Sequence, residues 1–381
     1  MIEVKRASVL VVGAGIVGVI TAKFLVERGV ENIVVIDEKY PGSGGTFRCA
    51  TGIRASFTSI EHVEAMKRSI ELWAKLAKQH GFEYQREGYL WMMTREEDLK
   101  LFSRVASFHN KHGIPSRLVS TEEIREIVPY INLDGVVGGL YDPLAGKADN
   151  FRALLEILRY IETSGVSVYR STKAYGLVAR GNRVVRVETS RGLIEADVVV
   201  IAAGHGSKKL LNTLGVKLPT KNVAKHALIT EAFQYNIKPL IIDWASSSYL
   251  VQVFHGGFLI GAELEEESDT KASNRIDYLY RAARIWVKYF PWLREVRVLR
   301  YWTGYYVMTP DHHPVIGPIG EYDNLYVATG FSGHGFMMAP ITGEALADYI
   351  TKGKPSHSIM EKFRLERFKR GKLIKEIAVF G

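Results

Sequence analysis

The segment SVLVVGAGIVGVITAKFLVERGVENIVVIDE, residues 8–38, constrains the fold of this chain more than any other part. A β-branched run leads into Gly13, Gly15 and Gly18 with G-x-G-x-x-G spacing, then into an amphipathic helix and a second β-branched run that ends at Asp37. Glycine permits a tight turn at the first position, the approach of a pyrophosphate at the second, and close packing of helix on strand at the third. The carboxylate of Asp37 can accept hydrogen bonds from an adenosine ribose. The segment therefore predicts a dinucleotide site rather than a purely structural glycine turn.

The apolar run from Val9 to Leu25 has the composition of a membrane or signal segment but not its pattern. It is shorter than about 20 residues and is interrupted by glycines, where a spanning helix would continue. The 381 residues, 47% of them hydrophobic, can bury a sizeable core in two domains. The single cysteine, Cys49, cannot form an intrachain disulfide, which favours a reducing compartment, so a cytoplasmic location is expected.

The net charge of +9 invites a nucleic-acid interpretation, which the distribution of charge does not support. The basic residues are spread widely except in KFRLERFKRGKLIK, residues 362–375. A nucleic-acid partner is therefore not expected. The basic segment predicts a solvated C-terminal helix, and the alternatives are docking to a partner subunit or to an acidic membrane surface on the inner face.

Two further strand ends present small residues, as the first one does. The strand 198–201 is followed by two alanines and a glycine, residues 202–204, and the strand that begins at Leu325 is followed by GFSGHG, residues 330–335. Residues 39–57 form a long loop rich in Gly, Ser and Thr. Small residues let a strand end approach a ligand. An extended cofactor that lies across one sheet accounts for all three strand ends and for the loop.

Four motifs in sequence order carry a resemblance to a known family. They are VVGAGIVG, GSGGTFRCATGIR, GYYVMTPDHHPVIGP and GFSGHGFMMAP. Over nearly its full length the chain resembles the D-amino acid oxidase superfamily of FAD enzymes, in the branch that contains sarcosine oxidase, glycine oxidase and, most similar, the catalytic β-type subunit of archaeal dye-linked L-proline dehydrogenase. The resemblance implies FAD as the cofactor, with the loop from Gly330 to Met337 against the isoalloxazine ring. Backbone N–H groups and a helix N-terminus there can stabilise the negative charge that develops at flavin N1 and C2=O.

The expected fold class is α/β: a Rossmann-like FAD-binding domain of the glutathione-reductase type, with a second α+β substrate domain built on a mostly antiparallel sheet. The FAD-binding domain is expected to be discontinuous, over residues 1–80, 147–220 and 303–381. The substrate domain is expected over residues 81–146 and 221–302.

Aromatic and β-branched content with flanking glycines predicts strands in the second domain. A helix is predicted with its apolar residues at helical spacing, and another after Pro340, with its N-terminus facing the strand ends. The predicted strands are 88–93, 224–230, 248–254 and 257–263, and the spaced residues of the first helix are Ile276, Leu279, Tyr280 and Ala283.

Departures from the sarcosine oxidase pattern bear on function. The cysteine that tethers the flavin there corresponds to Gly304, which implies noncovalent FAD. A lysine that serves oxygen activation corresponds to Leu259, which implies a dehydrogenase rather than an oxidase. A second lysine, which helps to hold the substrate carboxylate, corresponds to Met337, whereas its partner arginine is retained as Arg54.

Candidate site residues follow from this resemblance, and each has a plainer alternative. Arg54 can give a bidentate contact to a carboxylate, although it could be an ordinary surface arginine. Arg48 is expected to touch FAD or to brace its loop, and His334 to contact the flavin rather than act as a spacer. Four further candidates are expected to lie on strands above the flavin, and for each a packed core aromatic or histidine fits at least as well as a substrate contact: Tyr249, Tyr306, His226 and His255. The candidate catalytic residues are Arg54, Tyr249, His255 and Tyr306; the candidate FAD contacts are Gly13, Gly15, Ile16, Val17, Gly18, Asp37, Glu38, Lys39, Gly45, Thr46, Arg48, Ala174, Ala203, Gly204, Gly304, Phe331, Gly333, His334, Gly335, Phe336 and Met337.

Histidines 312 and 313 lie in a turn before Pro314, and their spacing does not give a metal-binding set. No metal site is expected.

The resemblance implies oxidation of an amino acid, with L-proline the best match, by hydride transfer from the carbon next to nitrogen to flavin N5. The amine must react in its neutral form, so activity should rise with pH, and electrons should pass to a dye, a quinone or a partner flavin subunit. The alternatives are a sarcosine, glycine or D-amino acid oxidoreductase, and an electron-transfer or scaffolding subunit without its own substrate, which the missing lysine at Met337 keeps open. A nicotinamide enzyme is weaker, since the glycine loop 330–335 has no role there.

Overall fold

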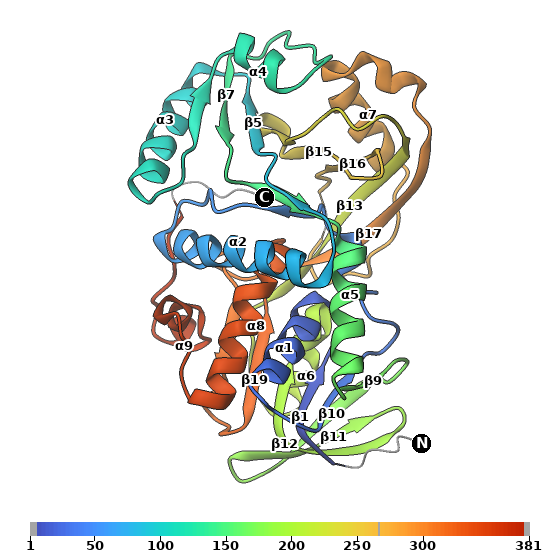
Figure 1. The fold of residues 1–381 in the computed structure, drawn as a ribbon, viewed down its shortest axis with the longest axis vertical. Coiled ribbons are helices and arrows are strands. Elements are labelled where there is room, and N and C mark those ends of the chain that lie inside the picture. The colour runs from blue at the N-terminus through green and yellow to red at the C-terminus, as the bar shows by residue number, and fades with distance from the viewer. Residues whose placement is uncertain (1–5, 266, 377–381) are drawn as a thin grey trace.

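The computed structural model describes residues 6–265 and 267–376. One sheet forms the lower half of the molecule in Figure 1 and a second sheet the upper half, and the long helix α2 (Ile60–His80) lies across the middle. This arrangement confirms the predicted fold class. Within the described ranges, none of the helices combines the length and the hydropathy that a membrane span requires.

The first sheet is parallel at its centre. β1 (Arg6–Val12) lies between β12 (Gly192–Ile201) and β2 (Ile33–Ile36), parallel to both. The β-branched runs of the sequence form these strands, as predicted. The outer strands are β9 (Ser167–Tyr169), parallel to β2; β19 (Leu325–Thr329), parallel to β12; and the antiparallel β10 (Ala174–Arg180), β11 (Arg183–Thr189) and β18 (Val315–Pro318).

Both faces of this sheet are buried. Val9 and Val11 of β1 pack into one core cluster and Leu10 and Val12 into another, as alternation along a strand requires. Figure 1 shows the helices α1, α5 and α8 along one side of the sheet. Their bounds are α1 (Ile16–Glu27), α5 (Asn150–Thr163) and α8 (Gly335–Lys352), and α6 (Ser207–Asn212) contributes to the other cluster.

Helix α8 differs from the expectation. It begins at Gly335, with His334 at its N-cap, so that Pro340 lies inside the helix rather than before it. A proline removes one backbone N–H and crowds the preceding turn. Here Pro340 is buried and α8 packs against α1 and α2, so packing of the helix outweighs the cost.

The second sheet is mostly antiparallel, which confirms that part of the predicted fold. Only β14 and β5 pair in parallel among its described strands. The predicted boundary between domains at residue 303 falls inside β17, the strand at one edge of this sheet. Residues 377–381 of the predicted FAD-binding segment lie outside the described residues. In spatial order the strands are β17 (Val298–Met308), β13 (Lys221–Ala232), β16 (Gly257–Ala262), β15 (Ser248–Gln252), β14 (Leu240–Asp243), β5 (Tyr89–Met93), β7 (Gly138–Asp142) and β6 (Arg117–Val119).

Helix α7 (Asp277–Tyr289) packs on the second sheet with a face other than the predicted one. The sequence indicated an apolar stripe that included Ile276 and Tyr280, yet these side chains are 63% and 71% exposed. The buried face carries larger aromatic side chains, which remove more apolar area from water. These are Tyr278, Trp286 and Tyr289, with Ala282 between them.

The remaining elements are short or peripheral. The basic segment 362–375 was predicted to be a solvated helix, and this is wrong in its described part: α9 (Glu366–Lys369) has four residues, and the side chain of Arg367 is buried against Asp311 at 2.8 Å. The other elements are a small sheet of β3 (Gly52–Ile53), β8 (Gly146–Ala148) and β4 (Tyr84–Gln85), and the helices α3 (Glu96–Lys111) and α4 (Thr121–Ile127).

Candidate flavin and substrate site

The glycines between β1 and α1 are required by backbone contacts. Gly13 has φ +111°, and a Cβ there would lie 2.3 Å from the carbonyl oxygen of Ala202. A Cβ on Gly18 would lie 2.0 Å from the carbonyl oxygen of Gly13. Gly15 is the N-cap of α1, whose first turn continues with the apolar Ile16. The helix N-terminus therefore carries a partial positive charge beside small residues, which suits a pyrophosphate.

The carboxylate of Asp37 closes the same edge of the sheet. Its two oxygens accept hydrogen bonds from the backbone N–H groups of Ala14 and Lys39, each at 2.9 Å. Burial raises the pKa of Asp37, and these two hydrogen bonds only partly oppose the shift. Glu38 points outward and pairs with Lys173 at 3.2 Å, next to Ala174 at the start of β10.

The loop after Asp37 folds over the start of α1. Gly42 N–H donates to the carbonyl of Ala14 at 3.0 Å, and Ile16 N–H donates to Thr46 Oγ1 at 3.0 Å. Arg48 donates to the carbonyl oxygens of Ser43 and of Gly44, the latter at 2.7 Å. The predicted brace within this loop is therefore present, whereas contacts of Gly45, Thr46 and Arg48 with FAD stay predictions.

Three strand ends meet at the candidate flavin site, as the sequence predicted. Ala202 N–H donates to the carbonyl of Val12 at 2.9 Å, which brings the small residues after β12 to the end of β1. Gly204 follows with φ +54°, and its carbonyl accepts a hydrogen bond from Thr329 Oγ1 at 3.2 Å. Ala203 lies between them. The ends of β1, β12 and β19 thus present backbone rather than bulky side chains to one edge.

The loop 330–335 leads into α8 under the second sheet. Gly333 has φ +97°, and a Cβ there would lie 2.6 Å from the ring of Tyr306. His334 is buried at the N-cap of α8, whose first turn contains Gly335, Phe336 and Met337. Gly304 lies two residues before Tyr306 on β17, and a Cβ there would lie 3.2 Å from Arg48 Cδ. Phe331 packs beside Gly335. The structure thus brings together β17, the loop 39–57 and the loop 330–335.

Arg54 is a buried cation at the end of β3. Its side chain is 3% exposed, its guanidinium lies 3.9 Å from the ring centroid of Phe57, and it donates to the carbonyl of Ser56 at 2.7 Å. Burial lowers the pKa of Arg54 to about 10, and the nearby Tyr89, Glu376 and Asp142 partly oppose this shift. A buried arginine next to aromatic rings can receive a carboxylate with little competition from water.

The other candidate catalytic residues lie at two depths. Burial raises the pKa of Tyr306 to about 12, and the nearby Cys49 and Glu263 add to the shift. Burial also raises the pKa of Tyr249 strongly, and the neighbouring Tyr306 and Tyr278 add to it. Gly261, opposite Tyr249 in the sheet, makes room for its ring. Tyr249 and Tyr306 are half-buried, whereas His255 is exposed in the turn between β15 and β16, so the structure does not place it with these two tyrosines.

His226 also lies on the second sheet, and its environment supports the plainer interpretation. It is buried, its ring stacks on Tyr278 of α7 at 5.3 Å, and Thr303 Oγ1 lies 3.0 Å from its Nδ1. Tyr278 belongs to the core cluster on the far side of this sheet from Trp91 and Leu259. The contacts of His226 therefore favour a packing role.

Several residues of the site were missed by sequence reasoning. Phe57 and His62 stack next to Arg54, Trp73 Nε1–H donates to the carbonyl of Met337 at 3.1 Å, and Tyr89 and Asp142 face Arg54 from the second sheet. Only Phe57 has a local signal, because it lies three residues after Arg54 in the same loop. The others reach the site through pairing of strands and packing of α2.

The comparisons with known proteins agree with this geometry. The sequence pattern of the DAO family, described as FAD dependent oxidoreductase, matches residues 8–349. The chain belongs to this family. Its sarcosine oxidase subunit beta relatives include those of Rhodobacter capsulatus, 26% identical over 99% of this chain and 92% of the relative, and Rhizobium meliloti, 28% identical over 97% and 90%.

Solved structures are similar over nearly the whole chain. L-proline dehydrogenase from P. horikoshii has 36% sequence identity and a TM-score of 0.92, with 97% of this chain and 100% of that chain covered. Glycine oxidase from Bacillus cereus has a TM-score of 0.83 at 22% identity over 93% and 97%, which shows the fold alone. This chain is therefore a FAD-dependent oxidoreductase of the family that acts on amino acids and related amines.

The residues present fit FAD. Gly15 and the N-terminus of α1 suit its pyrophosphate, Asp37 stands at the end of β2, where an adenosine ribose would lie, and the loop 330–335 meets β17 where the ring would lie. The individual contacts remain our proposal.

FAD is expected to be bound without a covalent link. Position 304, where the resemblance places a tethering cysteine, is glycine, and Cys49 is held by Asn150 and by the carbonyl of Thr46. Burial raises the pKa of Cys49 to about 11, which disfavours the nucleophilic thiolate. Acid precipitation should leave the flavin absorbance in the supernatant. Absorbance that stays with the pellet after washing would show a covalent bond.

Proposed function

We propose that this protein is an amino acid dehydrogenase, with L-proline as its best substrate candidate. The observation that carries the proposal is the buried Arg54 beside Tyr89 and Tyr306. Tyr249 lies near both of these tyrosines, and the Tyr306 ring packs against Gly333 of the loop 330–335. A substrate that is small, carries a carboxylate and has an apolar body suits this environment. The 36% identical L-proline dehydrogenase supports the choice of substrate.

The residues of this chain orient the substrate and control its surroundings. Arg54 would hold the carboxylate, and the tyrosines of the second sheet would close the site above and exclude water. FAD, when bound, would supply the acceptor for the hydride from the carbon next to the amine nitrogen. The N-terminus of α8, at His334 and Gly335, would place backbone N–H groups where negative charge develops on the ring. The amine must be neutral to react, so activity should rise with pH.

The acceptor of the electrons is proposed to be a molecule other than oxygen, such as a quinone or a partner flavin subunit. Leu259, buried in β16, stands where the resemblance places an oxygen-activating lysine. The relatives that are named sarcosine oxidase subunit beta support a hetero-oligomer. The same relatives favour a second candidate substrate, sarcosine or glycine.

Anaerobic titration of the holoenzyme tests the function. L-proline should bleach the flavin absorbance at lower concentration than D-proline, sarcosine or glycine, and in air hydrogen peroxide should form far more slowly than a dye is reduced. Bleaching by sarcosine or glycine alone would select the second candidate. A flavin that no amino acid reduces would contradict the proposal and indicate an electron-transfer or scaffolding subunit.

A further inference from the structure

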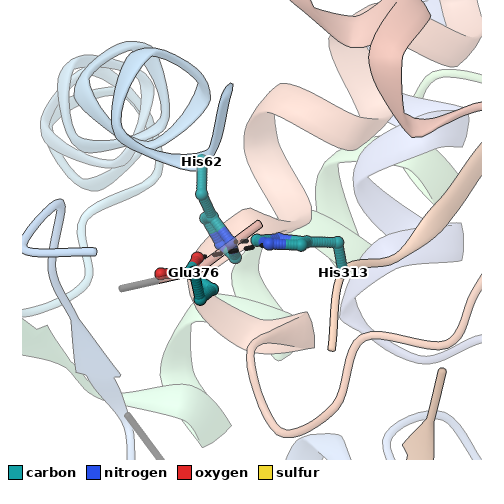
Figure 2. A group of neighbouring side chains, drawn as sticks. All are labelled: His62, His313 and Glu376. Atoms are coloured by element: carbon teal, nitrogen blue, oxygen red, sulfur yellow. Dashed lines mark hydrogen bonds and ion pairs between the residues drawn. The ribbon is translucent and has the colours of Figure 1, made fainter. Parts of the chain in front are cut away.

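Three side chains from distant segments meet beside His334. His62 comes from the first turn of α2, His313 from the turn after β17, and Glu376 from the C-terminal segment, and Figure 2 shows the three side chains converging. Nδ1 of His62 lies 2.9 Å from Nδ1 of His313, and Nε2 of His313 lies 3.2 Å from Oε1 of Glu376. Both histidines are 1% exposed or less. The contacts form a buried chain, Glu376 to His313 to His62.

Glu376 anchors one end of this chain at the N-terminus of α2. Its oxygens accept hydrogen bonds from Thr58 N–H at 3.0 Å, from the Thr58 hydroxyl and from Ser59 Oγ at 2.8 Å. Burial would raise the pKa of Glu376, but the contact with His313 and the hydrogen bonds from Thr58 and Ser59 outweigh it and lower the pKa. The group is thus a carboxylate at neutral pH, placed where a helix N-terminus stabilises negative charge.

His62 ends the chain on an aromatic stack that includes the candidate substrate arginine. The rings of His62 and Phe57 are stacked, 3.7 Å apart at 8°, and Arg54 lies 3.9 Å from the centroid of the Phe57 ring. The His62 ring and the Arg54 guanidinium each lie over a face of the Phe57 ring. At these distances both groups cannot occupy the same face, so the Phe57 ring lies between Arg54 and His62. The ring of His334 packs edge-on against Phe57 at 4.8 Å and against His62 at 5.2 Å.

The hydrogen bond to His313 is what orients the ring of His62. Burial lowers the pKa of His62 well below its usual value, with His313, His334 and Arg54 adding to the effect, so the ring is neutral. Its Nε2 is buried without a hydrogen-bond partner among the described residues. The contact of Nδ1 with His313 is therefore the polar contact that fixes the ring, and stacking passes that orientation to Phe57.

A metal ion at this cluster is a poor alternative. The two histidines and the glutamate lie within 4.8 Å of one another and are ligand types that metals accept. However, His313 faces His62 with Nδ1 and Glu376 with Nε2, and the lone pairs of these nitrogens diverge across the ring. One ion cannot replace both contacts without rotation of a side chain that is 1% exposed.

We propose that Glu376, His313 and His62 are positioning residues. They hold the side chains of Arg54 and His334 in place and do not themselves touch the substrate. The carboxylate sets the orientation of His313, His313 sets that of His62, and the stack of His62 on Phe57 holds the guanidinium in line with the substrate carboxylate. The substrate site thus depends on a residue of the C-terminal segment, more than 300 positions from Arg54. The proposal rests on the proposed function in one respect, that Arg54 receives a carboxylate.

The test uses the holoenzyme and the variants His62→Phe, Glu376→Gln and their double mutant. His62→Phe keeps the stack on Phe57 and removes the hydrogen bond, whereas Glu376→Gln keeps the length and removes the charge. Acetate binding, read from the flavin spectrum, probes Arg54 without turnover. Each single variant should weaken acetate binding and raise the KM for the amino acid by about tenfold, with kcat changed less than about threefold. The double mutant should be no more than about twofold worse than either single variant, because the residues act through His313.

Glu126→Gln on the exposed side of α4 is the matched control and should leave acetate binding unchanged. The proposal would be overturned if the effects of the two single variants multiply in the double mutant. It would also be overturned if neither variant changes acetate binding. A stoichiometric metal in the purified wild type that is lost in the variants would replace the proposal with a metal site. If no amino acid reduces the wild-type flavin, the proposed function fails, and acetate binding still decides the role of the three residues.

Discussion

Replacement of Arg54 by methionine should raise the KM for the amino acid substrate on the order of 10- to 1000-fold and leave the flavin content near normal. A substrate carboxylate brings a negative charge into a site where Arg54 is 3% exposed, and an unpaired buried charge is costly. Loss of a charged hydrogen-bonding partner costs about 1.5 to 4 kcal/mol. Methionine keeps much of the bulk against Phe57 and removes all the donors. Steady-state kinetics and the ratio of flavin to protein measure the two effects.

Arg104→Met provides the control, because Arg104 is an exposed arginine on α3 and the chemical change is the same. It should leave KM unchanged. An Arg54→Met protein that keeps its flavin and oxidises its substrate with wild-type kinetics would remove Arg54 from the substrate site. Loss of FAD from this variant would instead assign Arg54 to the cofactor, since it lies in the loop 39–57, which folds over the start of α1.

The nucleotide-binding half of the site was predictable because its signals are local. The turn from β1 to α1 needs glycine at positions 13 and 18, where a Cβ would lie within 2.3 Å of a backbone oxygen. A sequence that forms this turn must therefore carry glycines with the G-x-G-x-x-G spacing. Asp37 follows from the length of the helix and of the second strand. The small residues after β12 and β19 follow from the close approach of strand ends.

The surroundings of Arg54 were not predictable in the same way. His62, His313 and Glu376 are separated by about 250 and 63 positions, and each stands in a segment whose local pattern has another explanation. His62 lies in a segment with the pattern of an amphipathic helix, and Glu376 is a single acidic residue directly after the basic segment 362–375. What joins them is the docking of the C-terminal segment, through Arg367 and Asp311, onto the turn after β17.

The errors of the sequence interpretation have physical causes. The helical spacing of Ile276 and Tyr280 defines an apolar stripe on α7, but Tyr278, Trp286 and Tyr289 define another, and the one with more aromatic area is buried. Proline is common at the first position of a helix, which favours a helix start near Pro340, yet α8 begins five residues earlier. Periodicity locates a helix, and only packing decides which stripe is buried and where the helix begins.

Replacement of Gly13 by alanine should have the largest effect on stability and on FAD binding of any single change in the nucleotide turn. The residue has φ +111°, which L side chains rarely adopt, and the added Cβ would lie 2.3 Å from Ala202 O and 3.1 Å from Ala203 Cα. These two atoms belong to the backbone directly after β12 and cannot rotate away as a side chain could. The ends of β1 and β12 must therefore separate to relieve the overlap. We expect the free energy of unfolding of the apoprotein to fall by about 4 kcal/mol or more, in the range of severe core mutations. FAD should bind at least 100-fold more weakly, because the N-terminus of α1 shifts with the turn.

Gly165→Ala separates strain from overlap. Gly165 also has a positive φ, +90°, but a Cβ there would point into open space among the described residues. Alanine at this position carries only the cost of the left-handed conformation, about 1 to 2 kcal/mol. Urea unfolding of the two apoproteins and titration with FAD by fluorescence compare the two sites. Equal losses of stability, with equal FAD affinity, would mean that strain alone explains the requirement for glycine, and that the contact between Gly13 and the end of β12 does not shape the cofactor site.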